Sequence, residues 1–378
     1  MREYVDAGHP VSLYIHVPFC TTRCGYCAFY SLPASKCGRE LRDRYYDTLM
    51  RQLEELAGEL GRPFHTVYVG GGNPGLLGAR RLRSILSLAC DAGKPEEVSV
   101  EINPETLDES FDSLCGIVTR FSAGIQSFSP HSLSILQRNA DVKAVERALD
   151  LLCDFRRVSG ISFNADLMMN IPHTSVSSTI DDINRLVSYR PEHVSLYSLT
   201  FEEGTRLVET EQPLDEDEEA DNLIRCWDEL GRLGYEHYEV SAFARDGHYC
   251  RHNLVYWNLG QYIGLGPSAE SSVGWSRVVS SREAETLEGY LDRPSFDSEM
   301  LTVEQTVEEY VMTRLRTKWG IDRQSFLERF GTSFDSLFLQ AVSRLDPSWY
   351  DDDGQFFALK RDGVMVMNRI LLSLLAGL

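Results

Sequence analysis

Three cysteines within eight residues constrain this chain more than any other feature of its sequence. They stand as Cys20-x-x-x-Cys24-x-x-Cys27, directly after the β-rich run 12–17 and Pro18. A loop that leaves a strand can bring such closely spaced thiolates around one small inorganic group. Ordinary buried cysteines are the plain alternative, because free Cys is among the most buried residue types. A disulfide framework fits poorly, since the local count is odd and no export signal is evident.

Two kinds of metal centre suit this spacing. Structural zinc normally takes four ligands, and no Cys-x-x-Cys or His-x-x-His pair elsewhere offers an obvious fourth. Three thiolates without a fourth suit a four-iron cluster that keeps one iron open for another ligand. The spacing therefore favours an iron–sulfur cluster held by Cys20, Cys24 and Cys27, with the other cysteines outside it.

The cysteines and their flank, Tyr14-Ile-His-Val-Pro-Phe-Cys20, resemble the radical S-adenosylmethionine (SAM) superfamily, in the group of oxygen-independent coproporphyrinogen III oxidases and their relatives. The resemblance extends through nearly the whole chain. It implies a [4Fe–4S] cluster whose open iron binds SAM, and reductive cleavage of SAM to methionine and a 5′-deoxyadenosyl radical. The oxidases resemble Cys-x-x-x-Cys-x-x-Cys-x-Cys, whereas this chain has Phe29 at the fourth cysteine. Phe29 therefore favours the heme chaperone branch of the group.

Charge and composition narrow the partners. The 378 residues include 37 Lys and Arg against 57 Asp and Glu, a formal net charge of −20. Phosphate binding needs a basic surface, so this charge argues against a nucleic-acid partner and against the RNA-modifying radical SAM enzymes. Nine cysteines and a polar N-terminal stretch unlike a signal peptide indicate a reducing cytosol. No apolar run has the length of a membrane span, so an integral membrane protein is not expected.

Strand-like and helix-like segments alternate along the first half of the chain. Apolar or β-branched runs occur at 13–17, 66–69, 98–102, 121–125, 161–167 and 194–199, with amphipathic segments between them. Such alternation predicts βαβ units and a parallel sheet. Six units match the partial (β/α)6 barrel of TIM type that the resemblance implies.

The resemblance also implies a smaller, mainly helical, winged-helix-like C-terminal domain, which completes an α/β fold. We expect residues 1–235 to form the barrel with its cluster and SAM site. Residues 236–290 form an extension in this interpretation, and residues 291–378 form the C-terminal domain. Residues 282–298 lack a clear pattern and are predicted to be a connector.

Polar or glycine-rich residues follow the predicted strands, at the ends where barrel folds carry their chemistry. The run 70–75 formally fits a dinucleotide-binding G-x-G-x-x-G or a tight turn, but it resembles the family's Gly-Gly-Thr-Pro stretch, which contacts SAM. Arg138 matches an arginine that pairs with the SAM carboxylate, a role suited to a guanidinium fork. A solvated strand-end carboxylate is the alternative for Glu101. The SAM-binding residues that the resemblance implies are Tyr14, Gly71, Gly72, Asn73, Glu101, Gln126, Arg138 and Asp166.

Four positions depart from the family's pattern. Asn73 replaces Thr, Ala140 replaces His, Asn170 replaces Gly, and Glu270 replaces His. These departures keep open a degenerate member that retains the cluster for structure only.

The hexapeptide His252-Asn-x-x-Tyr256-Trp257 resembles a signature of the heme chaperone branch. An imidazole can ligate iron, and aromatic rings can pack on a porphyrin face. If the stretch is helical, His252 and Tyr256 share one face by their i, i+4 spacing. The alternative is a hydrogen-bonded core histidine. The resemblance implies that His252, Tyr256 and Trp257 bind heme.

The sequence thus predicts a cytoplasmic protein with a [4Fe–4S] cluster and SAM that binds heme and passes it to an acceptor protein. A membrane-associated acceptor would bring the chain to the membrane periphery. The rival interpretation is an oxidative decarboxylase of a porphyrinogen, a coproporphyrinogen III oxidase, which Phe29 disfavours. Cleavage of SAM stays open.

Overall fold

A sheet of 12 strands, in the order β14-β13-β12-β11-β1-β4-β5-β6-β7-β8-β10-β9, organises the molecule. The structure is a computed structural model that describes residues 4–292 and 296–376. Neighbouring parallel strands form the centre of the sheet. They are β1 (Val11–Val17), β4 (Thr66–Gly71), β5 (Glu97–Ile102), β6 (Arg120–Gln126), β7 (Ser162–Met169) and β8 (His193–Ser198). These are the strands that the sequence predicted, and the partial-barrel prediction is confirmed.

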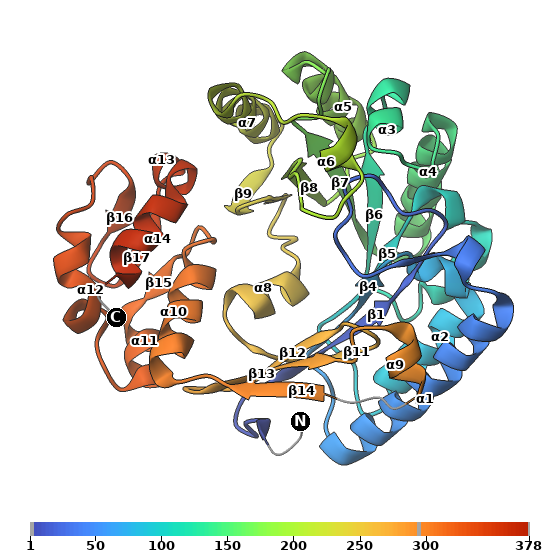
Figure 1. The fold of residues 1–378 in the computed structure, drawn as a ribbon, viewed down its shortest axis with the longest axis horizontal. Helices are drawn as coiled ribbons and strands as arrows, with labels where there is room; N and C mark the ends of the chain where they lie inside the picture. Colours follow the sequence, from blue (N-terminus) through green and yellow to red (C-terminus); the bar gives the residue numbers. More distant parts are fainter. Residues whose placement is uncertain (1–3, 293–295, 377–378) are drawn as a thin grey trace.

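Helices follow the outer side of the curved sheet (Figure 1). They are α1 (Arg39–Leu60), α2 (Ala79–Ala89), α4 (Val142–Ser159), α5 (Val176–Ser188) and α7 (Glu216–Arg232). The connection between β5 and β6 contains the short 3-10 helices η4 (Pro104–Thr106) and η5 (Glu109–Leu114) instead. Four acidic residues, 216–219, form the first turn of α7, where Asp215 caps the helix and negative charge is favoured by the helix dipole.

The two faces of each central strand differ in polarity. In β1, Leu13, Ile15 and Val17 are fully buried in the main hydrophobic core. The alternating positions are polar: Ser12 and His16 are also buried, and Tyr14 between them is half-buried. Polar side chains of this second kind bond to one another across strands: the Thr66 hydroxyl donates to Ser12 Oγ over 2.8 Å. The period of two therefore puts an apolar face under the helices and a polar face inside the barrel.

Both ends of the central sheet are extended by strands that the sequence analysis did not predict. On one side β1 pairs in parallel with β11 (Gln261–Leu265), which is followed by antiparallel β12 (Glu270–Gly274), β13 (Val278–Glu283) and β14 (Phe296–Met300). On the other side β8 pairs with β10 (Ala242–Ala244), and β10 with β9 (Glu236–Glu239). The helix α8 (Arg251–Trp257) lies on the concave side of the sheet (Figure 1).

The prediction of a connector over residues 282–298 was wrong for the part that the structure describes. This part contains the end of β13, the helix α9 (Leu287–Asp292) and the start of β14, while residues 293–295 lie outside the described residues. Residues 297–300 of β14 are exposed, because the strand lies at the end of the sheet. An exposed edge strand is held by backbone pairing and leaves no hydrophobic period to detect.

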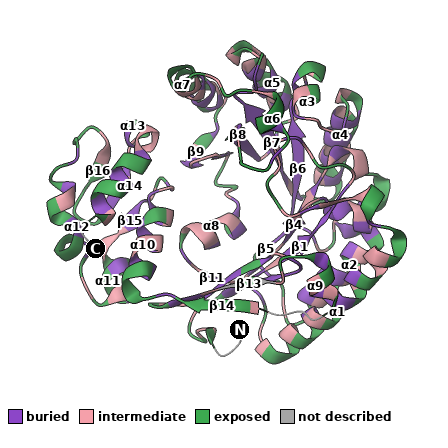
Figure 2. Ribbon diagram, in the orientation of Figure 1, coloured by how far each residue is buried: buried purple, intermediate pink, exposed green. Residues whose placement is uncertain are grey.

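A second hydrophobic core builds the C-terminal domain, and Phe326, Phe334 and Phe338 are fully buried in it. Figure 2 shows buried segments in purple among the elements of this domain. Its helices are α10 (Val303–Arg314), α11 (Arg323–Phe330), α12 (Phe334–Val342), α13 (Arg361–Met365) and α14 (Met367–Leu375). A small antiparallel sheet joins β15 (Ile321–Asp322), β17 (Phe356–Leu359) and β16 (Tyr350–Asp352). Helices with a small sheet match the predicted winged-helix-like arrangement. The residue boundaries of the three expected parts stay a prediction.

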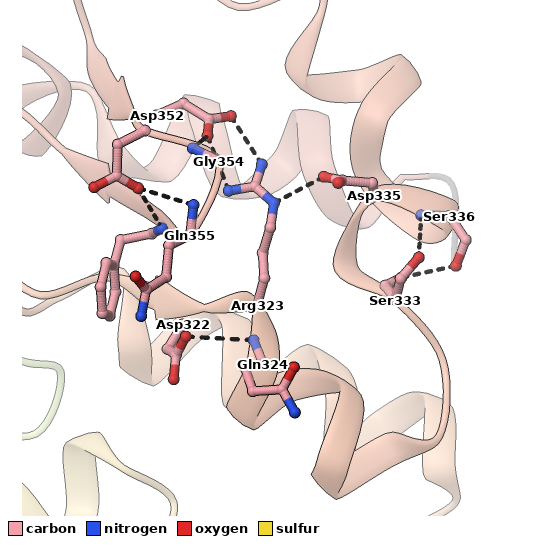
Figure 3. A network of polar contacts seen from close by, with 11 residues as sticks. Asp322, Arg323, Gln324, Ser333, Asp335, Ser336, Asp352, Gly354 and Gln355 are labelled. Atoms are coloured by element: carbon pink, nitrogen blue, oxygen red, sulfur yellow. Dashed lines mark hydrogen bonds and ion pairs between the residues drawn. The ribbon is translucent and has the colours of Figure 1, made fainter.

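Arg323 connects the small sheet of this domain to the helix α12 through hydrogen bonds (Figure 3). Its guanidinium donates to both carboxylate oxygens of Asp352, over 2.9 and 2.8 Å, and to Asp335 Oδ1 over 3.0 Å. The side chain is only 15% exposed. Since Asp352 ends β16 and Asp335 lies in the first turn of α12, one cation pairs with two carboxylates from separate elements.

Replacing Arg323 with Met should lower the free energy of unfolding by about 1–3 kcal/mol, because charge-assisted bonds are lost and two carboxylates are left close together. Urea denaturation followed by circular dichroism measures this change. The matched control is Arg157→Met, which breaks one exposed ion pair with Asp154 on α4 and should change stability by less than about 0.5 kcal/mol. Equal stabilities of the two variants would contradict the assigned role.

Candidate functional site

The cysteine loop lies at the carboxyl end of β1 and is anchored at its centre. The short parallel strands β2 (Phe19–Cys20) and β3 (Leu32–Pro33) flank it. The Gly25 N–H donates to Leu136 O over 3.0 Å, directly after α3 (Pro130–Ile135). The Gly25 carbonyl accepts from the N–H of Leu207 over 2.9 Å, at the start of α6 (Leu207–Thr210). Two distant segments thus fix the loop that carries the three thiols.

A cavity of about 660 Å³ opens next to this loop, at the carboxyl ends of the parallel strands. It is large enough for a small-molecule ligand. The cavity is lined by all three cysteines and by six of the predicted SAM-binding residues. These six are Gly71, Gly72, Glu101, Gln126, Arg138 and Asp166.

Backbone conformation shapes the cavity wall at two places. An added Cβ at Gly72 would lie 2.6 Å from the Phe19 carbonyl oxygen, so only glycine lets β4 approach the cysteine loop this closely. Gln126 has a φ of 68°, and the pairing of β6 with β7 is irregular between Gly124 and Gln126. A buried non-glycine residue in the left-handed region is uncommon and clusters at functional sites. The strand end is therefore bent to aim Gln126 into the cavity.

Arg138 links the cysteine loop to the strand ends. Its Nη2 donates to Gly124 O over 2.7 Å and to Asn103 Oδ1 over 3.2 Å, and Nη1 lies 3.4 Å from Cys24 Sγ. Burial opposes the charge, but the neighbouring Tyr26 and Cys24 help to raise the pKa of Arg138, so the guanidinium stays charged. Its buried Nε has no partner among the described residues. A fixed cation with spare donor capacity suits a carboxylate ligand.

Two half-buried carboxyl groups, Glu101 and Asp166, line the same cavity as this cation. Glu101 accepts hydrogen bonds from the Tyr68 hydroxyl (2.7 Å) and from the Gly71 N–H (3.0 Å). Burial raises the pKa of Glu101 to about 7, against the effect of the Tyr68 bond, and nearby Asp166 adds to the rise. Burial likewise raises the pKa of Asp166. The cavity therefore presents both carboxyl acceptors and a cation, as a zwitterionic ligand requires.

The donor set fits a four-iron cluster better than a single metal ion. Within residues 4–292 and 296–376, no group of three His, Cys, Asp or Glu side chains is arranged to hold one metal ion. A zinc site needs its thiolates to converge on one point, whereas the thiolates of a cluster each bind a different iron. Cys20, Cys24 and Cys27 line one cavity, which fits the cluster.

Comparisons with known proteins agree with this geometry. The sequence matches the Radical SAM superfamily over residues 14–186 and the HemN C-terminal domain over residues 301–366. It is 31% identical to the heme chaperone HemW of Escherichia coli (strain K12), covering 96% of this chain and 97% of that one. It is 36% identical to the heme chaperone HemW of Mycobacterium tuberculosis (strain ATCC 25618 / H37Rv), covering 83% of each chain. The chain belongs to the HemW family.

A solved structure has a similar fold over almost the whole chain. The structure superposes on the coproporphyrinogen III oxidase HemN from Escherichia coli, a radical SAM enzyme, with a TM-score of 0.81 and 19% identity, over 98% of this chain and 91% of that one. At this identity the likeness shows the fold alone. Membership of the radical SAM superfamily implies a [4Fe–4S] cluster and SAM. None of the described helices combines the length and apolar character that spanning a membrane requires.

Two of the predicted SAM-binding residues do not line the cavity of this HemW-family chain. The Asn73 side chain is fully buried and accepts from the Gly75 N–H and the Thr106 hydroxyl, each over 3.1 Å. It joins the turn η3 (Pro74–Leu77) to the loop after β5. The Tyr14 hydroxyl lies 3.0 Å from His16 Nδ1, inside the barrel. Asn73 and Tyr14 do not line the cavity. Their contacts with SAM stay predictions of the resemblance.

The positions that depart from the family's pattern are all accommodated elsewhere. Asn170 adopts a φ of 57°, which Asn tolerates, and its amide bonds to Ser198 Oγ over 2.9 Å. Ala140 is buried in the core, and Glu270 pairs with Arg282 over 2.6 Å. With Asn73, none of the four is among the residues that line the cavity.

The predicted heme-binding residues lie far from the cysteines along the strands. His252 is completely buried, with Nδ1 2.7 Å from Thr66 Oγ1 and Nε2 2.8 Å from the Tyr256 hydroxyl. Both ring nitrogens are thus occupied, and burial lowers the pKa of His252 to about 3. This geometry matches the alternative of a hydrogen-bonded core histidine. Tyr256 and Trp257 are half-buried, and the indole N–H of Trp257 has no partner among the described residues.

The sequence analysis missed several residues that line the cavity. Tyr26 lies between two of the cysteines, Ser122 lies on β6, and Tyr197 lies at the end of β8. The signal was available in part: Ser122 stands two residues before Gly124 and four before Gln126, so the period of two puts it on the inner face. Tyr197 would have followed from the same rule applied to β8.

Replacing Cys20, Cys24 and Cys27 together with Ala should abolish the broad visible absorbance of the cluster and all bound iron after anaerobic reconstitution. These thiols share one cavity wall, and they would supply the ligands of the cluster. The matched control replaces Cys90, Cys115 and Cys153, which lie on or next to the outer helices, and should keep its iron. Iron retained by the first triple variant would contradict the assignment.

Proposed function

We propose that this chain binds heme and passes it to an acceptor protein, with a cluster and SAM held in the barrel. The observation that carries the proposal is similarity over almost the full length to proteins named heme chaperone HemW. A chain with nine free cysteines would act in the reducing cytosol, and a membrane-associated acceptor would bring it to the membrane periphery. Heme binding, the acceptor and the location are parts of this proposal.

Phe29 supports a chaperone against the rival oxidase. Its side chain is 70% exposed and lines the cavity beside Cys27. A phenyl ring can neither ligate iron nor donate a proton, whereas the resemblance gives the oxidases a cysteine there. Decarboxylation of a porphyrinogen would therefore lack a group that the resemblance places next to the cluster.

The arrangement of the cavity supports SAM binding rather than a purely structural cluster. When bound, the cluster and SAM supply one-electron chemistry. Arg138 would hold the SAM carboxylate, and Glu101 would accept from its amino group or a hydroxyl. Gly71 and Gly72 would let backbone approach the methionine part, and Asp166 would reach the ribose. Because the four departures lie outside the cavity lining, they do not remove any of these contacts.

Replacing Arg138 with Ala should weaken SAM binding by about 1.5–3 kcal/mol, the usual scale for a hydrogen bond to a charged group. Equilibrium dialysis of labelled SAM with the reconstituted protein measures the change. The matched control is Arg185→Ala on α5, which removes a half-exposed ion-pair partner of Glu146. This variant should bind SAM normally. Unchanged affinity in Arg138→Ala would remove this arginine from the site.

Within the α8 signature, Trp257 is the residue best placed to offer heme a surface. Its ring is half-buried, and the guanidinium of Arg316 lies 5.8 Å from the ring centroid. An aromatic face packs on a porphyrin, and an adjacent cation suits a propionate. Ligation of the iron by His252 would require the ring to leave both of its hydrogen bonds. The heme contacts of Tyr256 and His252 stay predictions of the resemblance.

The purified protein should bind heme with a distinct Soret band and should release no carbon dioxide from coproporphyrinogen III, even with SAM and a reductant. Heme titration and a radiolabel release assay measure the two properties. Trp257→Ala should weaken heme binding, while Trp349→Ala, in the C-terminal domain, should not. Detectable decarboxylation would make the oxidase interpretation correct. A Soret band that moved in His252→Ala would restore that histidine as ligand.

A further inference from the structure

We propose that Tyr68 and His252 are positioning residues that hold the Glu101 carboxyl in the SAM cavity. They would thereby connect the chaperone signature on α8 to the site at the opposite end of the barrel. The inference rests on the proposed SAM site and adds to it two residues that do not themselves line the cavity. It is carried by a continuous series of contacts, from His252 on α8 through Tyr68 on β4 to Glu101 on β5.

The segment that carries α8 closes the end of the barrel opposite the cysteine loop. Glu97, the first residue of β5, accepts the backbone N–H groups of Arg251 (3.0 Å) and His252 (3.1 Å). Thr66, the first residue of β4, bonds to His252, and Arg120, the first residue of β6, donates to His248 O over 3.3 Å. The start of α8 is thus fixed to the amino ends of three strands, whereas the cavity lies at their carboxyl ends.

The protonation state of His252 follows from its neighbours. The Thr66 hydroxyl donates its hydrogen to Ser12 Oγ, so it can only accept from His252 Nδ1. The imidazole is neutral because burial lowers its pKa to about 3, and Nε2 therefore accepts from the Tyr256 hydroxyl. The ring is held on both sides and has one orientation. A neutral imidazole with both nitrogens bonded is a rigid surface for whatever packs on it.

Tyr68 packs on that surface. Its ring stacks on the His252 ring with centroids 5.0 Å apart and an angle of 26° between the planes. Its hydroxyl then donates to Glu101 Oε1 over 2.7 Å, while Glu101 Oε2 accepts from the Gly71 N–H. Both oxygens of the cavity carboxyl are therefore fixed, one by backbone and one by a tyrosine whose position depends on His252.

Other titratable groups around Glu101 do not replace this bond. Tyr14, Tyr197 and Tyr256 face it from β1, β8 and α8, and Asp166 faces it from β7. Burial raises the pKa of Glu101 to about 7, and the Tyr68 hydrogen bond is the side-chain interaction that opposes this rise. Without the hydroxyl, the carboxyl should hold its proton to a higher pH. A charged carboxylate is the form that binds an ammonium group. As the pH falls, the variant should therefore lose affinity for SAM at a higher pH than the wild-type protein does.

The test is SAM affinity as a function of pH, between about pH 6 and 9, in the reconstituted full-length protein. Tyr68→Phe keeps the ring stacked on His252 and removes only the hydroxyl. We expect SAM binding to weaken roughly tenfold at neutral pH and its midpoint to move to higher pH. Tyr235→Phe is the matched control: its hydroxyl donates to Pro191 O over 2.6 Å, away from the cavity, and its pH profile should match wild type.

A second variant tests the contribution of His252. His252→Gln removes the stacked ring, and it should also weaken SAM binding while bound iron is unchanged. In the double variant the losses should not add, because both residues act through the same carboxyl. A Tyr68→Phe profile identical to wild type would overturn this inference and leave the SAM site intact. Absence of SAM binding in the wild-type protein would instead overturn the SAM site itself, and this inference with it.

Discussion

The polar interior of the curved sheet is the constraint on which the rest of the structure depends. The outer face of the central strands is covered by helices and must be apolar. The inner face of these strands carries polar side chains instead. Each buried polar group left without a partner would cost about 1–3 kcal/mol. The barrel therefore has to be filled with mutually bonded groups: Asn164 bonds to Ser122, and His193 bonds to both Asn164 and Tyr238. The segment around α8 completes this filling at the amino ends of the strands.

Much of the fold could be predicted because its signals are local. Apolar runs and amphipathic helices located the six central strands, and the spacing of the cysteines identified the end of the barrel that carries the chemistry. The pairing of β11 with β1 could not be predicted, since their residues are about 250 positions apart along the chain. Antiparallel strands β12 to β14 are held by backbone hydrogen bonds at the end of the sheet. Their side chains show no period that separates them from a connector.

The candidate site was predictable for residues whose type alone fixes their chemistry. It was less predictable for residues whose role depends on the direction in which the side chain points. Cysteines, strand-end glycines and Arg138 came together at one cavity as expected. Asn73 did not, because its side chain turns into the core to bond Thr106 and Gly75. His252 has the residue type of an iron ligand, but its position beneath Tyr68 depends on contacts with three strands. Such contacts leave no pattern in a single sequence, and Tyr68 itself resembled an ordinary strand tyrosine.

The two edges of the sheet show how so large an array of strands avoids pairing with other molecules. At one edge, β9 is covered by the link into the C-terminal domain: the Val240 N–H donates to Arg316 O, and the Lys318 N–H to Tyr238 O. At the other edge, β14 carries the exposed acidic residues Asp297 and Glu299. Like charges on an open strand repel a second copy aligned beside it. In this 12-stranded sheet one edge is thus covered by the chain itself, and the other carries charges that oppose pairing with a second copy.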